Sequence, residues 1–119
     1  MTLIIDKNNM LDITSITHLV IHCSDTGDNV NIGAEEIHKM HLNFGWDGIG
    51  YHKVICRDGS VQNGRPEYWK GAHVKGLNNH SLGVCLIGSK NFTVMQFNSL
   101  EKTLLDWKSN NIALETFTL

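Results

Sequence analysis

The chain is organised around residues 17–24, which read THLVIHCS. Leu19, Val20 and Ile21 put apolar side chains on both faces of a strand, which is typical of a central, buried strand. The residues that follow, DTGDN, favour a turn. His22 therefore lies where a sheet passes into a loop, and α/β proteins commonly build their sites at such places. Two interpretations of His22 stay open, a metal ligand and a structural histidine that closes the strand.

The composition predicts one soluble globular domain that spans residues 1–119. Of these residues, 41% are hydrophobic and 18% are charged, which are ordinary proportions for such a domain. The formal net charge of −2 provides no basic surface for nucleic acid or for an anionic membrane. No apolar run approaches the ~18 residues that cross a bilayer, and the first residues do not resemble a signal peptide.

The cysteines indicate a reducing compartment. Cys23, Cys56 and Cys85 are odd in number, widely spaced and placed in apolar, strand-like runs. Buried reduced thiols are therefore expected rather than a framework of disulfides. Together with the N-terminus, the cysteines predict a cytoplasmic protein, and we expect it to be a monomer.

Hydrophobic periodicity predicts a helix over residues 32–44. Its packing stripe is expected to consist of Ile37, Met40, His41 and Phe44. Gly45 follows as a typical helix stop. His38 and His41 are three residues apart and could share a metal ion, but His38 falls off the stripe and no acidic or cysteine partner accompanies them. Structural roles are favoured for both.

The rest of the chain predicts strands and one more helix. Residues 91–110 form that helix, with an apolar face of Phe97, Leu100, Leu104 and Trp107. Strands are expected at residues 53–56, 60–62 and 81–88, with further candidates at 3–5 and 112–119. Residues 63–79 form a long irregular segment, which is usually functional when it is ordered. Buried strands beside amphipathic helices indicate an α/β fold, a mixed central β-sheet flanked by α-helices.

Short motifs between residues 17 and 107 resemble those of one enzyme family. In chain order they are His22-Cys23-Ser24, Gly50-Tyr51-His52, Arg57-Asp58-Gly59, Gly64-Arg65, Gly71-Ala72-His73, Gly76-x-Asn78 and Ser81-Leu82-Gly83-Val84. Each motif alone is weak, but their order is similar to that in the zinc-dependent N-acetylmuramoyl-L-alanine amidases of the amidase-2 type. That family includes the amidase endolysins of bacteriophages and shares its fold with the peptidoglycan recognition proteins.

The resemblance implies a reaction, a cofactor and a set of site residues. Such enzymes hydrolyse the amide between N-acetylmuramic acid and the L-alanine of the stem peptide, so peptidoglycan or a muropeptide is the expected partner. His22 matches the first zinc ligand, and Tyr51 matches the catalytic tyrosine beside the metal-bound water. His73 and Asn78 match the loop that lines the substrate groove. Zinc would lower the pKa of its bound water to around 7, and a phenol could donate to the oxyanion.

Each of these residues also has a plainer interpretation. Tyr51 could cap a strand, and His73 could be a surface residue of its loop. Trp69 could anchor its loop or form a platform for a sugar. Structural roles are preferred for His52, Cys56 and Cys85.

The sequence departs from the family near its end. In the family, a second histidine and then a cysteine or aspartate ligand follow the last long helix, whereas residues 108–119 contain no histidine or cysteine. We therefore expect one amidase-2-like domain, residues 1–119, that is C-terminally truncated and has an incomplete zinc site. Three functions stay open: a zinc amidase of the phage-lysin type that is released to the cell wall, a peptidoglycan-binding module without turnover, and a remnant.

Overall fold

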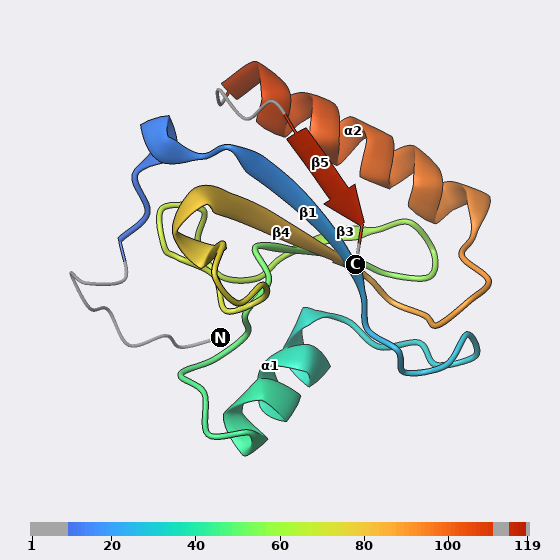
Figure 1. Cartoon of the computed structure of the whole chain (residues 1–119). Helices are drawn as coiled ribbons and strands as arrows, with labels where there is room; N and C mark the ends of the chain where they lie inside the picture. The colour runs from blue at the N-terminus through green and yellow to red at the C-terminus, as the bar shows by residue number, and fades with distance from the viewer. Residues whose placement is uncertain (1–9, 111–114, 119) are drawn as a thin grey trace.

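The structure is a computed structural model that describes residues 10–110 and the backbone of residues 115–118. Its centre is a five-stranded sheet in the order β3-β2-β4-β1-β5 (Figure 1). The strands are β1 His18–Cys23, β2 Lys53–Ile55, β3 Val61–Asn63, β4 Ser81–Leu86 and β5 Glu115–Thr118. Strands β1, β2, β4 and β5 pair in parallel, whereas β2 and β3 are antiparallel. The expected mixed central sheet is therefore confirmed.

The α-helices of the described region, α1 Ala34–Asn43 and α2 Val94–Asn110, lie on different sides of the sheet (Figure 1). On the α2 side, the buried core includes Leu19, Ile55, Leu82, Val84, Leu86 and Trp107. On the α1 side, the core consists of Ala34, Ile37, Ile49, Val54 and Ile87. Short 3-10 helices, η2 Ile13–Ser15 and η3 Asn78–His80, precede β1 and β4. Within the described residues, no helix has the length and apolar character needed to cross a membrane.

The pairing of β1 with β4 decides which side chains can meet. His22 pairs with Cys85 in the parallel register. Because paired residues share a face and alternate residues return to it, Ser81 and Gly83 lie on the same face as His22. Val54, which pairs with Cys85, belongs to the core beneath α1. This face of the two central strands therefore points toward α1 and the loops around it.

The first helix is shorter than predicted. It runs from Ala34 to Asn43, and Phe44, which was expected on its packing stripe, is its C-cap and is 66% exposed. His38 was predicted to lie off the packing stripe of this helix, which was wrong, because the residue is buried. Its ring accepts a hydrogen bond from a loop amide, so a polar contact rather than apolar packing buries it.

The apolar face of the second helix was predicted incorrectly at its start. The helix begins at Val94, and Phe97 is 53% exposed. Gln96 is buried instead, because its carboxamide donates hydrogen bonds to the carbonyl oxygens of Ile55 at 3.2 Å and Ile87 at 2.8 Å. Trp107 is buried as expected. The strand expected within residues 112–119 is β5, and the candidate strand at residues 3–5 lies outside the described residues.

Candidate active site

His22 of β1 meets His73, which comes from the loop before η3. Nε2 of His22 lies 2.8 Å from Nδ1 of His73, and the two rings meet edge to face with their centroids 5.0 Å apart. Gly83 of β4 lies against the His73 ring, since a Cβ at Gly83 would come within 2.6 Å of that ring. The contact between His73 and the sheet therefore requires a residue without a side chain at this position.

Tyr51, which lies in the loop that precedes β2, is the third residue of the site. Its ring centroid lies 5.0 Å from that of His22. Burial raises the pKa of its phenol above the ordinary value, and the neighbouring Cys85 thiol adds to this shift. Burial also raises the pKa of Cys85 to about 12. At neutral pH the phenol therefore keeps its proton and can donate a hydrogen bond.

Both histidines of the site are neutral at pH 7. Burial lowers the pKa of His22 to about 4 and that of His73 to about 2. Each ring then has one N–H group and one nitrogen lone pair. The site can therefore accept and donate hydrogen bonds, and His22 is in the protonation state that metal binding needs.

The loop that carries Tyr51 is held by helix α1 and by a buried arginine. The amide of Ile49 donates to Nδ1 of His38 at 3.0 Å, and the amide of Gly50 donates to Nδ1 of His41 at 2.9 Å. Nε of Arg65, which is 4% exposed, donates to the Ile49 carbonyl oxygen at 2.8 Å. His38 and His41 thus have the structural roles favoured from the sequence, and the loop is fixed through both its amides and its carbonyls.

Asn78 supports the loop that carries His73. Its side-chain oxygen accepts hydrogen bonds from the backbone amides of His73 and Val74, both at 3.0 Å. The structure therefore places this predicted substrate-binding residue behind His73. Substrate contact by Asn78 stays a prediction.

His52 and Trp69 form the buried support beneath the site. Nε2 of His52 donates to the Trp69 carbonyl oxygen at 2.7 Å, and its Nδ1 accepts from the Gly83 amide at 3.0 Å. Each of the two residues is 1% exposed. His52 is structural, as predicted. Of the two interpretations of Trp69, the structure supports a loop anchor, because a buried indole cannot present a face to a sugar.

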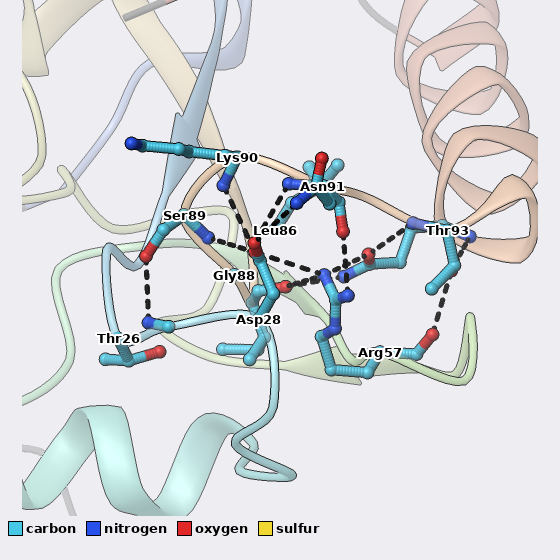
Figure 2. Close-up of polar contacts among 12 residues, drawn as sticks. Thr26, Asp28, Arg57, Leu86, Gly88, Ser89, Lys90, Asn91 and Thr93 are labelled. Atoms are coloured by element: carbon cyan, nitrogen blue, oxygen red, sulfur yellow. Dashed lines mark hydrogen bonds and ion pairs between the residues drawn. The ribbon is translucent and has the colours of Figure 1, made fainter.

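An ionic network fixes the loop that follows β1, which ends at Cys23, one residue after His22 (Figure 2). The carboxylate of Asp28 accepts hydrogen bonds from the consecutive amides of Ser89, Lys90 and Asn91 at 2.8, 3.1 and 3.1 Å. Nη1 of Arg57 lies 3.8 Å from the same carboxylate. These backbone bonds, more than the arginine, hold the pKa of Asp28 below its ordinary value. The network joins the loops that follow β1 and β4, so it fixes the carboxyl-terminal ends of these two strands, where His22 lies.

The described residues do not complete a metal site. Within residues 10–110, no group of three histidine, cysteine, aspartate or glutamate side chains could hold a metal ion. His73 alone lies within hydrogen-bond distance of His22 among such side chains. A catalytic zinc ion needs three protein ligands, and the described residues do not bring three such side chains together.

Two buried residues of β4 belong to the site and were missed in the sequence. Ser81, which is completely buried, has its hydroxyl 3.2 Å from Nε2 of His73. Cys85, which was interpreted only as a core residue, lies beside the phenol of Tyr51. The spacing Ser81-x-Gly83-x-Cys85 could have indicated their place in the site, because alternate strand residues share a face and the glycine leaves room for a ring.

The sequence matches a family profile described as N-acetylmuramoyl-L-alanine amidase (Amidase_2) over residues 12–116. The chain belongs to this family. It is 42% identical to the endolysin of Escherichia phage T7 over 95 residues, which cover 73% of this chain and 63% of that protein. It is 39% identical to the endolysin of Klebsiella phage KP32 over 100 residues, which cover 77% of this chain and 66% of that protein. The chain thus spans less than two thirds of the length of these relatives.

Solved structures show the same fold. The bumblebee peptidoglycan recognition protein PGRP-SA superimposes with a TM-score of 0.81 at 31% identity, covering 92% of this chain and 72% of that one. The N-acetylmuramoyl-L-alanine amidase LysC from Clostridium intestinale also gives a TM-score of 0.81, at 24% identity, covering 96% of this chain and 78% of that one. The family fold expected from the motifs is therefore confirmed.

Proposed function

We propose that this chain is a peptidoglycan amidase that cleaves the bond between N-acetylmuramic acid and the L-alanine of the stem peptide. The observation that carries the proposal is the meeting of His22, Tyr51 and His73 on one face of β1 and β4. Membership of the amidase family and the similarity to phage endolysins support it. The proposed substrate is peptidoglycan or a muropeptide, and the proposed acting form is a monomer.

Tyr51 is the proposed catalytic donor. Its phenol keeps its proton at neutral pH, because burial raises its pKa. A neutral phenol can donate a hydrogen bond to the amide oxygen as negative charge develops on it. His73 and Asn78 are proposed to line the substrate groove, with the carboxamide of Asn78 holding the backbone of His73 in place.

We propose zinc as the cofactor and His22 as one of its ligands. The neutral imidazole of His22 suits this metal, and zinc when bound would supply Lewis acidity. The described residues do not provide a complete set of ligands, so no catalytic step is assigned to the metal.

A second function, binding of peptidoglycan without turnover, is favoured by that same incomplete donor set. Hydrogen bonds to other protein groups hold the loop residues His73 and Asn78: the His73 amide donates to Asn78, and the His73 ring contacts the Ser81 hydroxyl. In either case we propose a phage-type lysin that is made in the cytoplasm and reaches the cell wall on release.

The chain offers a matched pair of variants to test the function, Tyr51→Phe and Tyr68→Phe. Tyr68 is 53% exposed and lies outside the site. Insoluble peptidoglycan is incubated with each protein, with and without added Zn²⁺, and both the new L-alanine amino groups and the protein bound to the pellet are measured. Loss of one oxyanion donor should reduce the release of amino groups about 10²- to 10³-fold in Tyr51→Phe and leave Tyr68→Phe unchanged.

The outcomes separate the two proposed functions. Release that depends on Tyr51 supports the amidase. Retention on peptidoglycan, but not on cellulose, without release supports the binding module and contradicts turnover by this chain. A protein that neither binds nor cleaves peptidoglycan contradicts both proposals.

A further inference from the structure

A chain of hydrogen bonds runs from His22 through His73 and Ser81 to a backbone carbonyl. Nε2 of His22 lies 2.8 Å from Nδ1 of His73, and Nε2 of His73 lies 3.2 Å from Oγ of Ser81. Oγ of Ser81 in turn lies 2.8 Å from the carbonyl oxygen of Leu77. Ser81 is completely buried, so its hydroxyl does not exchange these partners for bulk water.

The carbonyl at the end of the chain determines where each proton lies. A carbonyl oxygen only accepts, so the single hydroxyl proton of Ser81 is directed to Leu77. Oγ of Ser81 must then accept from His73, whose Nε2 carries the proton. An uncharged imidazole protonated on Nε2 has a lone pair on Nδ1, so Nδ1 of His73 accepts from Nε2–H of His22.

We propose that Ser81 is a positioning residue that sets the tautomer of His73 and, through His73, the tautomer of His22. This proposal rests on the proposed function in that the histidine pair forms the candidate active site. The lone pair of His22 is then on Nδ1, which is the nitrogen from which His22 can accept a substrate proton or bind a cation. Ser81 thus selects which atom of His22 is basic without contacting His22 itself.

The position of the His73 ring does not depend on Ser81 alone. The ring packs against Gly83, where a Cβ would come within 2.6 Å, and its centroid is 5.7 Å from that of the buried His52. The backbone amide of His73 is held by Asn78. Removal of the Ser81 hydroxyl should therefore leave the His73 ring in place. What it should change is which ring nitrogen of His73 carries the proton. A tautomer measurement separates this role from a purely structural one.

The test is long-range ¹H–¹⁵N NMR of the histidine side chains at neutral pH, which distinguishes rings protonated on Nδ1 from rings protonated on Nε2. In the unmodified protein both His22 and His73 should be protonated on Nε2. In Ser81→Ala, rings protonated on Nδ1 should appear for both residues, because the reversed hydrogen bond becomes available. Ser81→Thr, which keeps the hydroxyl, should restore the original spectrum.

Ser99→Ala is the matched control, since the Ser99 hydroxyl also donates to a backbone carbonyl, that of Gly59, outside the site. It should leave both tautomers unchanged. Protonation of His73 on Nδ1 in the unmodified protein, or an unchanged spectrum in Ser81→Ala, would overturn the proposal. The measurement on the unmodified protein decides the matter even where a variant fails to fold.

Activity gives a separate readout on the same proteins. Loss of one hydrogen bond that orders the site should lower amino-group release or peptidoglycan retention about fivefold to tenfold in Ser81→Ala, with recovery in Ser81→Thr. If the unmodified protein has the predicted tautomers but neither binds nor cleaves peptidoglycan, the proposed function fails and the role of Ser81 in setting the tautomers stands. Equal activity of Ser81→Ala and the unmodified protein would contradict any effect of Ser81 on function.

Discussion

At the scale of single residues, the candidate site consists of neutral groups whose ionisation is suppressed by burial. Burial is the largest cause of the lowered pKa of His22 and His73 and of the raised pKa of Tyr51. Such neutral groups interact with their neighbours through hydrogen bonds rather than through ion pairs. Protonation of the buried histidines would therefore lower the free energy of unfolding.

We predict that the protein loses stability as the pH falls below neutrality. Burial lowers the pKa of His52 from 6.5 to about 4, and protonation would remove the acceptor for the Gly83 amide. Because the folded pKa lies below the unfolded one, this contribution is fully present above pH 6.5 and is lost as the pH falls toward 4. His52 alone should reduce the unfolding free energy by up to about 1.4 kcal/mol per pH unit in this window.

The measurement is the urea midpoint at about pH 7.5 and about pH 5.5, a range in which the carboxylates remain ionised. His80→Asn is a suitable control, because His80 is exposed and its removal should leave the pH dependence intact. A midpoint that does not change between these two pH values would contradict the assignment of neutral, buried histidines.

Gly83 gives a second prediction at this scale. A Cβ at this position would lie 2.6 Å from the ring of His73, and β4 is a central strand that cannot move aside. Gly83→Ala should therefore reduce stability by about 1–3 kcal/mol and displace His73 from His22. Urea denaturation measures the first effect, and the tautomer spectrum of His22 measures the second. An alanine variant with unchanged stability and unchanged spectrum would show that the ring has more room than the structure indicates.

At the scale of elements, loops braced by the sheet and by α1 position the site, and Asp28 joins the loops that follow β1 and β4. Its carboxylate accepts hydrogen bonds from three consecutive backbone amides, and these amides would lose that acceptor if the carboxylate were removed. Asp28→Ala should therefore lower the urea midpoint and loosen the backbone after His22. Hydrogen exchange at the amides of Ser89, Lys90 and Asn91 should become faster.

Asp25→Asn provides the comparison for Asp28, because Asp25 is an exposed aspartate of the same loop. Asparagine tolerates the positive φ of 53° at this position. This variant should keep the exchange rates of the loop after β4. Equal exchange rates in Asp28→Ala and the unmodified protein would mean that the Asp28 carboxylate does not hold these amides.

Elements that satisfy one simple pattern were predictable from the sequence, and elements that depend on polar burial were not. The largely apolar runs of β1 and β4 indicate buried strands, because both faces of the sheet are covered. The face of α2 was misjudged at Phe97 because Gln96 is buried in its place, where it donates to the carbonyl oxygens of Ile55 in β2 and of Ile87 just after β4. The burial of His38 has the same kind of cause. Contacts of this type join segments far apart in the chain, so no local period reveals them.

The site was predictable to a similar degree. Family motifs indicated His22, Tyr51 and His73, and the structure brings these three together. The role of Ser81 depends on a loop that folds back onto β4, and the proton order along that contact depends on the Leu77 carbonyl. The spacing within β4 indicates that Ser81 and Gly83 share a face, but it does not indicate which loop residue lies against them.

At the scale of the whole molecule, the described region covers both faces of the sheet. One core lies between the sheet and α2, and the other lies beneath α1. The chain nevertheless matches only 63% of the length of the endolysin of phage T7. A core on each face favours a folded unit over a remnant without structure, whereas the proposed zinc site needs three protein ligands, which the described residues do not supply.

These two observations lead to a prediction about zinc. A ligand that binds the folded state raises stability by RT ln(1 + [L]/Kd), so a complete site of high affinity would raise the melting temperature of the 119-residue chain strongly. Nδ1 of His22 is the one nitrogen of this pair with a free lone pair, because Nδ1 of His73 already accepts from Nε2–H of His22, so only weak binding is expected. Added Zn²⁺ at about ten times the protein concentration should then shift the melting temperature by less than about 2 °C. A larger shift that is lost in His22→Ala, but kept in the exposed control His80→Asn, would show instead that this chain completes a zinc site.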